Sequence, residues 1–254
     1  MLLEVKNLTK NFGGLTAVND VSIIIQKGEL FSVIGPNGSG KSTLFNLISG
    51  VLPPTSGAVR FNNEVITGMK PHQIAFRGLG RTFQFTMLFQ DLRVIDNLII
   101  GQRMRLKTGI LDVIVHTKRA RTEEKLIREK AIEMLDFINL PRLANKIVNT
   151  LTQEEQKRLS IGTALMGSPA LLLLDEPTGC VNIEEIENLI ELIRNIKDKG
   201  ISVLLIEHKM RLVMDLADRI AVLNYGKKIA EGKPEEIRNN EDVIRAYLGG
   251  EYVA

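Results

Sequence analysis

A glycine-rich stretch, GPNGSGKST, occupies residues 35–43 and lies between an apolar segment and a helical one. Its glycines let the backbone turn so tightly that N–H groups converge on phosphate oxygens, at the positive end of the following helix. In the pattern GxxxxGK[ST], Lys41 is expected to reach the β- and γ-phosphates and Ser42 to ligate Mg²⁺. A chance flexible turn would need neither the strand before it nor the helix after it, so we interpret the stretch as a nucleotide cradle. Its predicted binding residues are Gly35, Pro36, Asn37, Gly38, Ser39, Gly40, Lys41, Ser42 and Thr43.

Two adjacent carboxylates, Asp175 and Glu176, follow the apolar run LLLL at 171–174. A buried strand of an α/β sheet delivers such residues to the carboxyl edge of the sheet, where ligands bind. We expect Asp175 to hold the Mg²⁺ shell and Glu176 to orient or deprotonate the attacking water. A strand that ends in two acids is weakly specific alone and also fits a helix cap. Beside the phosphate loop, it indicates hydrolysis of a nucleoside triphosphate.

The segments that must position these residues follow two patterns. Four short apolar segments in the N-terminal part are separated by turn residues and predict β-hairpins beside a central strand. These segments are LLEVKNLT, AVNDVSIII, GELFSVIG and AVRFNNEVI. The later runs LLLLD and ISVLLIE are continuous and flank a predicted helix over 183–199 that ends at Gly200. Such runs are typical of buried parallel strands joined by a crossover helix.

Helical spacing replaces these patterns from about residue 89 to residue 140. Within the charged run over 123–133 and just after it, we expect four apolar side chains to face inward, namely Leu126, Ile127, Ile132 and Leu135. The prediction is one domain over 1–254, in which residues 1–88 and 168–254 form the nucleotide-binding core and β subdomain. Residues 89–167 form an inserted helical subdomain.

A basic cluster accompanies this helical part. It fits a contact with an acidic partner or with lipid headgroups, but acidic residues follow within a turn, and we interpret it as a solvated face. Its members are Arg103, Arg105, Lys107, Lys118, Arg119 and Arg121.

The composition excludes several classes of protein. With 44% hydrophobic and 25% charged residues, the chain is neither collagen-like nor disordered. No window approaches the ~20 apolar residues of a membrane-spanning helix, and the N-terminus lacks a signal peptide's apolar stretch, so we expect a cytosolic chain. Cys180 has no second cysteine to pair with, and the three histidines are dispersed, so structural zinc is not expected. A net charge of +3 indicates no nucleic-acid partner.

Three further residues extend the pattern of the phosphate loop and the two carboxylates. Phe12 stands in KNFGG, Gln84 in RTFQ and His208 in LLIEH. In this order and spacing, the chain resembles the ATP-binding subunits of ABC transporters along nearly its whole length. The resemblance implies that Phe12 stacks on adenine and that His208 senses the γ-phosphate. It implies that Gln84 touches Mg²⁺ and the γ-phosphate side and connects the helical subdomain to the core.

The same resemblance implies the fold, the cofactors and the site. The fold is α/β, a P-loop NTPase core with an antiparallel β subdomain and an inserted helical subdomain, as in ABC ATPases, and the cofactors are ATP and Mg²⁺. The implied catalytic residues are Glu176, His208, Gln84 and Lys41. The implied Mg²⁺ ligands are Ser42, Gln84 and Asp175.

Within the family, several stretches look like the branched-chain amino-acid uptake group: GGLTAVNDVS, GLGRTFQ, VIDNLIIG, DRIAVLNYGKKIAEGKPEEIRNN and VIRAYLGGE. Exporter ATPases for lipopolysaccharide share the YLG ending, and urea or amide uptake systems look alike, but RTFQ and the long insert favour the amino-acid importer. The implied partners are membrane-spanning permease subunits and a second ATPase subunit, at the cytoplasmic face of the membrane. A soluble ABC-type ATPase of DNA repair or translation is the rival, yet such chains usually carry two cassettes or a coiled-coil insertion.

The chain departs from the family at the signature loop LSGGQ, which grips the γ-phosphate of ATP bound to the opposite subunit. The aligned stretch is LTQEEQKRLSIG, where a carboxylate such as Glu154 is expected to repel a triphosphate that it faces. The small residue, glycine and Asn-Pro that usually follow Glu176 are replaced by TGCVNI, and Lys209 replaces the acidic residue after the switch histidine. Thr152, Gln153, Glu154 and Glu155 stand in the place of serine, two glycines and glutamine.

These departures spare the residues that act on the subunit's own ATP and alter those that reach across a dimer. We therefore hypothesise a heterodimer in which the degenerate signature at 151–155 acts in trans on the partner's nucleotide. Wide tolerance of the loop, with two working sites, is the first alternative. A weakly hydrolysing regulatory subunit is the second.

Overall fold

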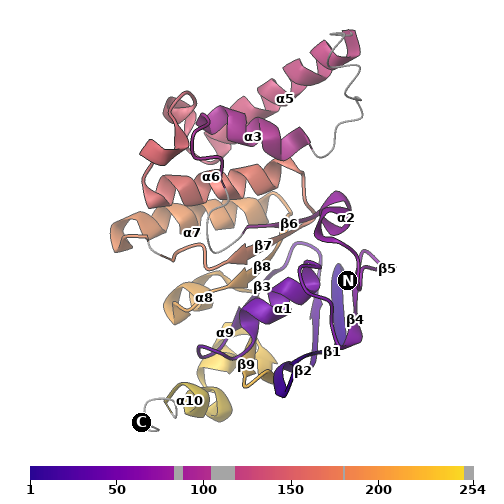
Figure 1. Cartoon of the computed structure of the whole chain (residues 1–254). Coiled ribbons are helices and arrows are strands. Elements are labelled where there is room, and N and C mark those ends of the chain that lie inside the picture. Colours follow the sequence, from indigo (N-terminus) through magenta and orange to yellow (C-terminus); the bar gives the residue numbers. More distant parts are fainter. Residues whose placement is uncertain (83–87, 104–117, 180, 249–254) are drawn as a thin grey trace.

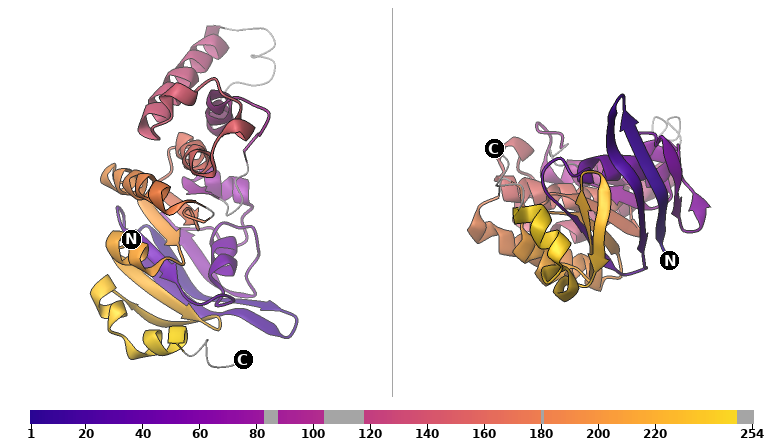
Figure 2. Two further views of the ribbon diagram at one scale, coloured as in Figure 1. Left: turned by 90° about the vertical axis from the view of Figure 1, so that its left-hand side faces the viewer. Right: turned by 90° about the horizontal axis from the view of Figure 1, so that it is seen from below.

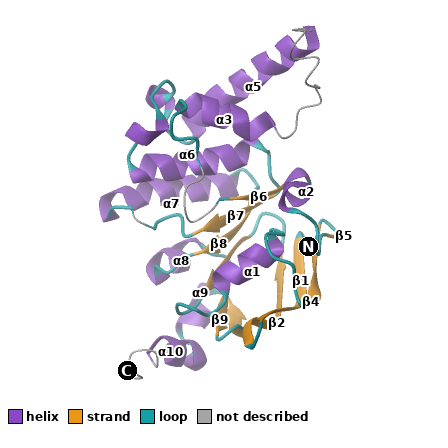
Figure 3. Cartoon of the chain, viewed as in Figure 1, coloured by secondary structure: helices purple, strands orange, loops and turns teal. Residues whose placement is uncertain are grey.

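The computed structural model describes residues 1–82, 88–103, 118–179 and 181–248 (Figure 1). Within this part of the chain, the strands form two sheets, and helices cover the larger one (Figure 3). No helix among the described residues combines the length and the apolar character needed to cross a membrane.

The antiparallel sheet has the order β2-β1-β4-β5. Its strands are β1 (Leu3–Phe12), β2 (Leu15–Ile25), β4 (Ser56–Phe61) and β5 (Glu64–Val65). The first two form a hairpin in which Phe12 pairs with Leu15, so Phe12 lies at its tip. The N-terminal hairpin predicted from the alternating segments is confirmed.

The larger sheet has the order β10-β9-β3-β8-β7-β6, and all its pairs are parallel except β9 with β10. Its strands are β3 (Leu30–Ile34), β6 (Leu79–Arg81), β7 (Leu171–Asp175), β8 (Ser202–Ile206), β9 (Arg219–Asn224) and β10 (Lys227–Gly232). Ile206 pairs with Asp175 on one side, and Val33 pairs with Ile206 on the other. The carboxyl ends of β3, β7 and β8 are therefore level, which brings the phosphate loop, the two carboxylates and His208 to one edge.

Helices occur in every part of the described chain. They are α1 (Lys41–Ile48), α2 (Pro71–Phe76), α3 (Val94–Arg103), α5 (Lys118–Phe137), α6 (Gln153–Met166), α7 (Ile183–Asp198), α8 (Met210–Leu216), α9 (Pro234–Arg238) and α10 (Glu241–Leu248), with short 3₁₀ turns at Pro141–Leu143 and Val148–Thr150. The group α3, α5 and α6 extends from one end of the molecule, and α5 lies farthest from the sheet (Figures 1 and 2). The predicted crossover helix is α7, which joins the parallel strands β7 and β8.

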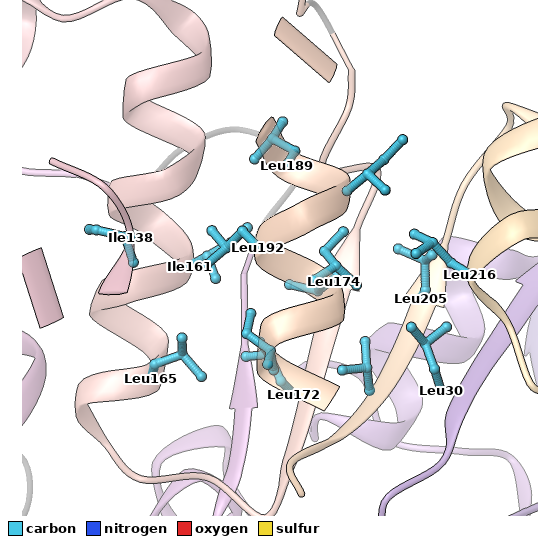
Figure 4. Packing of buried hydrophobic residues seen from close by; sticks show 14 of the residues in the cluster. Leu30, Ile138, Ile161, Leu165, Leu172, Leu174, Leu189, Leu192, Leu205 and Leu216 are labelled. Carbon is cyan, nitrogen blue, oxygen red and sulfur yellow. The ribbon is translucent and has the colours of Figure 1, made fainter. Parts of the chain in front are cut away.

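Hydrophobic side chains pack in two clusters, one on each face of the larger sheet. Along β7, Leu172 and Leu174 belong to the cluster shared with α6 and α7 (Figure 4). Leu171 and Leu173 belong to the other cluster, with α1 and the antiparallel sheet. Successive side chains of a strand point to opposite faces, so a strand that is covered on both faces must be apolar at every position. This explains the continuous run LLLL.

One expectation about α5 is wrong in part. Ile127 and Leu135 are buried as expected, but Leu126 is 63% exposed and Ile132 is 50% exposed. Residues four apart lie on one face of a helix, so the face through Ile127, Ala131 and Leu135 is buried, whereas Leu126 and Ile132 lie beside it. Of the basic cluster, Arg121 is exposed and the other side chains lie outside the described part of the chain.

Candidate functional site

The phosphate loop begins where β3 ends, and its backbone requires glycine at two positions. Gly35 has φ +151°, and a Cβ there would lie 2.1 Å from the carbonyl oxygen of Leu223. Gly40 has φ +101°, and a Cβ there would lie 2.3 Å from the carbonyl oxygen of Ala17. Any other residue would collide with the backbone of β9 or β2, so these glycines hold the loop against both sheets.

Lys41 is the first residue of α1, and its side chain is buried. Its Nζ donates hydrogen bonds to the carbonyl oxygens of Gly35 at 2.8 Å and of Pro36 at 3.0 Å. Burial lowers the pKa of Lys41, and the nearby carboxylates of Glu176 and Asp175 oppose this shift. The ammonium group is thus held inside the loop by weak neutral acceptors, which phosphate oxygens of a ligand can replace.

Asp175 ends β7 as expected, but a partner that the sequence analysis missed accompanies it. Nη2 of Arg81 lies 3.2 Å from Oδ2 of Asp175, and both side chains are buried. Nη1 of Arg81 donates to the hydroxyl of Ser49 on the α1 side at 2.5 Å. Burial raises the pKa of Asp175, and the charge of Arg81 opposes the rise. Oδ1 of Asp175 is buried and has no hydrogen-bond partner among the described residues.

Glu176 adopts a left-handed backbone conformation, with φ +47°. Non-glycine residues seldom adopt it, and such strain concentrates at functional sites. Its Oε1 lies 2.5 Å from Nε2 of His208, so the two predicted catalytic side chains meet directly. Buried Glu207 supports this arrangement, because its carboxylate accepts hydrogen bonds from the N–H of His208 and from the N–H and hydroxyl of Thr178. Glu207 was missed, although its place next to His208 is a usable signal.

A pocket of about 490 Å³ gathers most of the predicted site residues. Those that line it are Phe12, Asn37, Gly38, Ser39, Gly40, Lys41, Ser42, Thr43, Glu176 and His208. Gly35, Pro36 and Asp175 lie behind this lining, in contact with Lys41 or Arg81. Gln84 and Cys180 fall outside the described residues. The pocket also contains Tyr225, which the sequence analysis did not single out.

The altered signature segment begins α6, and its geometry corrects one expectation. Thr152 is the N-cap: its hydroxyl accepts from the N–H of Glu155 at 3.2 Å, and Oε2 of Glu155 accepts from the N–H of Thr152 at 2.8 Å. Glu154 was expected to face a triphosphate, but its side chain is buried and forms an ion pair with Arg158. The expectation was wrong because spacing of four residues places both charges on the inner face of α6.

Comparison with known proteins decides the family. A family model described as "ABC transporter" matches residues 18–179, more than half of the chain. The chain belongs to the ATP-binding subunits of ABC transporters. A second family model, described as "Branched-chain amino acid ATP-binding cassette transporter", matches residues 227–253 of this ABC ATPase.

Individual relatives are similar to this ABC ATPase over nearly its whole length. It is 42% identical over 249 residues to the high-affinity branched-chain amino acid transport ATP-binding protein BraF of Pseudomonas aeruginosa, and 43% identical over 249 residues to the corresponding protein LivG of Salmonella typhimurium, with 98% of each chain covered. Among solved structures, the ADP conformation of an ATP-binding cassette of an ABC transporter superposes with a TM-score of 0.85 at 34% identity, over 98% of both chains. The expected ABC ATPase fold is confirmed.

Proposed function

We propose that this ABC ATPase is the ATP-hydrolysing subunit of an importer for branched-chain amino acids and acts at the cytoplasmic face of the membrane. The observation that carries the proposal is the match over 98% of its length to proteins named for this transport. The match of residues 227–253 to the branched-chain group supports the same substrate class. The pocket that joins Phe12, the phosphate loop, Glu176 and His208 supports the ATPase role.

ATP fits the pocket by the chemistry of its lining. Lys41 would exchange the carbonyl oxygens of Gly35 and Pro36 for phosphate oxygens, which form stronger charge-assisted hydrogen bonds. The loop N–H groups and the start of α1 favour the negative charge of the phosphates. Phe12, 45% exposed at the tip of its hairpin, offers a ring on which adenine would stack.

Magnesium fits the same edge of the sheet. Oδ1 of Asp175, which has no partner among the described residues, and the hydroxyl of Ser42, an exposed residue, are oxygen donors of the kind that Mg²⁺ prefers. We assign Gln84 as a third donor. When bound, Mg²⁺ would neutralise charge on the phosphates. Arg81 keeps Oδ2 of Asp175 engaged, which leaves Oδ1 for the ion.

Hydrolysis would follow from the contact between Glu176 and His208. The carboxylate of Glu176 would orient the attacking water and accept its proton, while the left-handed backbone directs that side chain toward the pocket. His208 holds Oε1 of Glu176 at 2.5 Å in this structure. A bound γ-phosphate would offer His208 a second hydrogen-bond partner. The contact between Glu176 and His208 would therefore depend on whether the nucleotide still carries that phosphate.

The permease would contact the region around Leu88 and the helical insert. A second pocket of about 660 Å³ lies between α2, β6 and the helices α3 and α6, and its lining is mostly apolar. Phe76 lines it while 68% exposed, and Arg81 lines its inner side. An apolar groove with an exposed aromatic at its rim suits a helix from a membrane subunit. We infer the same division of the chain as the sequence predicts, with residues 89–167 as the helical subdomain.

A second, different ATPase subunit would complete the functional dimer. The N–H of Glu155 is engaged by Thr152, and no glycine occurs at 151–155 to let a phosphate approach the start of α6. The N-terminus of α6 would therefore bind the partner's nucleotide weakly. Lys209 donates to the carbonyl oxygen of Thr178 at 3.3 Å, which ties together the two other altered segments. This subunit's own site would depend on an intact signature loop from the partner.

Two measurements test these proposals. Cells that lack this chain should lose uptake of radiolabelled leucine but keep uptake of urea, and the wild-type gene should restore it, whereas a Glu176→Gln gene should not. Loss of urea uptake alone would contradict the substrate class. For the heterodimer, we expect Mg²⁺-dependent ATP hydrolysis by the purified chain to stay low as its concentration rises. Efficient hydrolysis with cooperative concentration dependence would establish a competent homodimer instead.

A further inference from the structure

The turn between β9 and β10 is fixed against the nucleotide pocket. Its central residues, Tyr225 and Gly226, both have left-handed backbones, with φ +45° and +78°. The N–H of Gly226 donates to the carbonyl oxygen of Ser39 in the phosphate loop at 3.1 Å, and its carbonyl oxygen accepts from the N–H of Asn19 at 2.8 Å. The turn is therefore tied to the phosphate loop on one side and to β2 on the other, and β10 also packs against β2.

Tyrosine is an unfavourable residue for this turn. Left-handed positions of tight hairpin turns favour Asn, Asp or Gly, and a bulky side chain there is strained. The side chain of Tyr225 is 87% exposed and has no hydrogen bond or ring contact among the described residues. The ring therefore adds little packing to the described fold, and asparagine would suit the left-handed turn better.

The position of the Tyr225 side chain at the nucleotide pocket offers a reason for an aromatic residue in this turn. Tyr225 lines the pocket that also contains Phe12, the phosphate loop, Glu176 and His208. The ammonium group of Lys10 lies 5.2 Å from the centroid of the Phe12 ring and donates to the carbonyl oxygen of Pro53, so Phe12 already has a neighbour on one side. A nucleoside in this pocket would lie between two aromatic residues that come from different sheets.

We propose that Tyr225 is a second aromatic contact for the nucleoside of the bound triphosphate, supplied by the β9–β10 turn. This inference rests on the proposed ATPase function. An aromatic face stacks on any base, so Tyr225 adds affinity and discriminates little between purines. The fixed turn places the backbone of Tyr225 beside the pocket before the nucleotide arrives, so that binding has to order only the side chain.

Calorimetric titration of the full chain with ATP, and separately with tripolyphosphate, tests the inference. Tyr225→Asn removes the ring and keeps a residue that favours the left-handed turn. We expect it to weaken ATP binding by about 5- to 150-fold, the range for loss of one stacked base contact, and to leave tripolyphosphate binding unchanged. Tyr225→Phe, the matched control, keeps the ring and should bind ATP as the wild type does.

The remaining outcomes overturn the inference in different ways. Equal ATP affinity of Tyr225→Asn and wild type would show that the ring does not touch the nucleoside. Equal weakening for ATP and tripolyphosphate would show that the turn supports the phosphate loop instead. Unchanged affinity with weaker ATP-dependent dimerisation would place the ring in a protein interface. If the wild type binds neither ligand, the proposed ATPase function itself fails.

Discussion

Replacing Arg158 with methionine is expected to destabilise the whole chain, because Arg158 joins two elements of the helical part. Its Nη2 donates to Oε2 of Glu154 at 2.8 Å, and Nε lies 2.6 Å from Oε1 as an ion pair without hydrogen-bond geometry. Its Nη1 donates to the carbonyl oxygens of Ile138 and Asn139, which follow α5. The methionine variant would leave a buried carboxylate and two carbonyl groups without their donor.

The magnitude follows from the burial of the pair, whose side chains are 10% and 3% exposed. Removal of one partner from a buried ion pair costs about 3–5 kcal/mol of the free energy of unfolding. In a domain of this size, each kcal/mol lowers Tm by about 2–4 °C, so Arg158→Met should melt roughly 6–20 °C below wild type. The double variant Glu154→Leu with Arg158→Met removes both charges and should recover most of this loss.

Thermal and urea unfolding followed by circular dichroism would measure the whole cycle of single and double variants. Burial raises the pKa of Glu154 above 4.5, so folding favours the protonated carboxyl group. The stabilisation from this protonated form is fully present below pH 4.5 and is lost as the pH rises through the pKa of the folded state. The free energy of unfolding of Glu154→Gln should therefore increase relative to that of wild type as the pH rises above 4.5. An Arg158→Met variant as stable as wild type would refute this reasoning. So would a Glu154→Gly variant that hydrolyses ATP faster without loss of stability, because its carboxylate would then face a nucleotide.

Three further predictions concern the phosphate loop and the pair of Glu176 and His208. Lys41→Met should abolish ATP binding measured by calorimetry. Because burial lowers the pKa of Lys41 below 10.5, the stability of wild type relative to this variant in urea unfolding should also increase as the pH rises toward 10.5. A stability difference that does not change with pH would contradict the burial of the ammonium group. Glu176→Gln should bind ATP normally yet release phosphate roughly 10²- to 10⁴-fold more slowly, and an unchanged rate would exclude Glu176 as the base. Gly35→Ala, whose Cβ would lie 2.1 Å from the carbonyl oxygen of Leu223, should lower the free energy of unfolding by about 1–3 kcal/mol, and full stability would mean that the loop relaxes freely.

Features carried by contiguous residues were predictable from the sequence. The phosphate loop is one run of nine residues between a strand and a helix, so local chemistry alone indicates its conformation. The run LLLLD likewise indicates a strand buried on both faces, and the carboxyl edge of a parallel sheet is where Asp175 and Glu176 had to lie.

Features that depend on register or on a helix face were missed. The pair of Arg81 and Asp175 joins residues 94 apart, and it exists because β6 lies beside β7 with Arg81 opposite Leu173. Nothing near Arg81 in the sequence specifies that pairing. The inward direction of Glu154 does have a signal in the sequence, because Arg158 follows it by four residues and the two charges can pair on one face of a helix.

The position of Arg81 has a mechanical consequence. Its side chain lines the apolar groove beside α2, while its Nη2 contacts the carboxylate of Asp175 behind the nucleotide pocket. A single side chain, that of Arg81, therefore connects the apolar groove to the carboxylate behind the nucleotide pocket. Packed interiors are stiff and transmit displacement, whereas a loop in the route would absorb it. A small shift of β6 caused by a helix pressing into the groove would reach the carboxylate directly, with no relay of separate conformational steps between them.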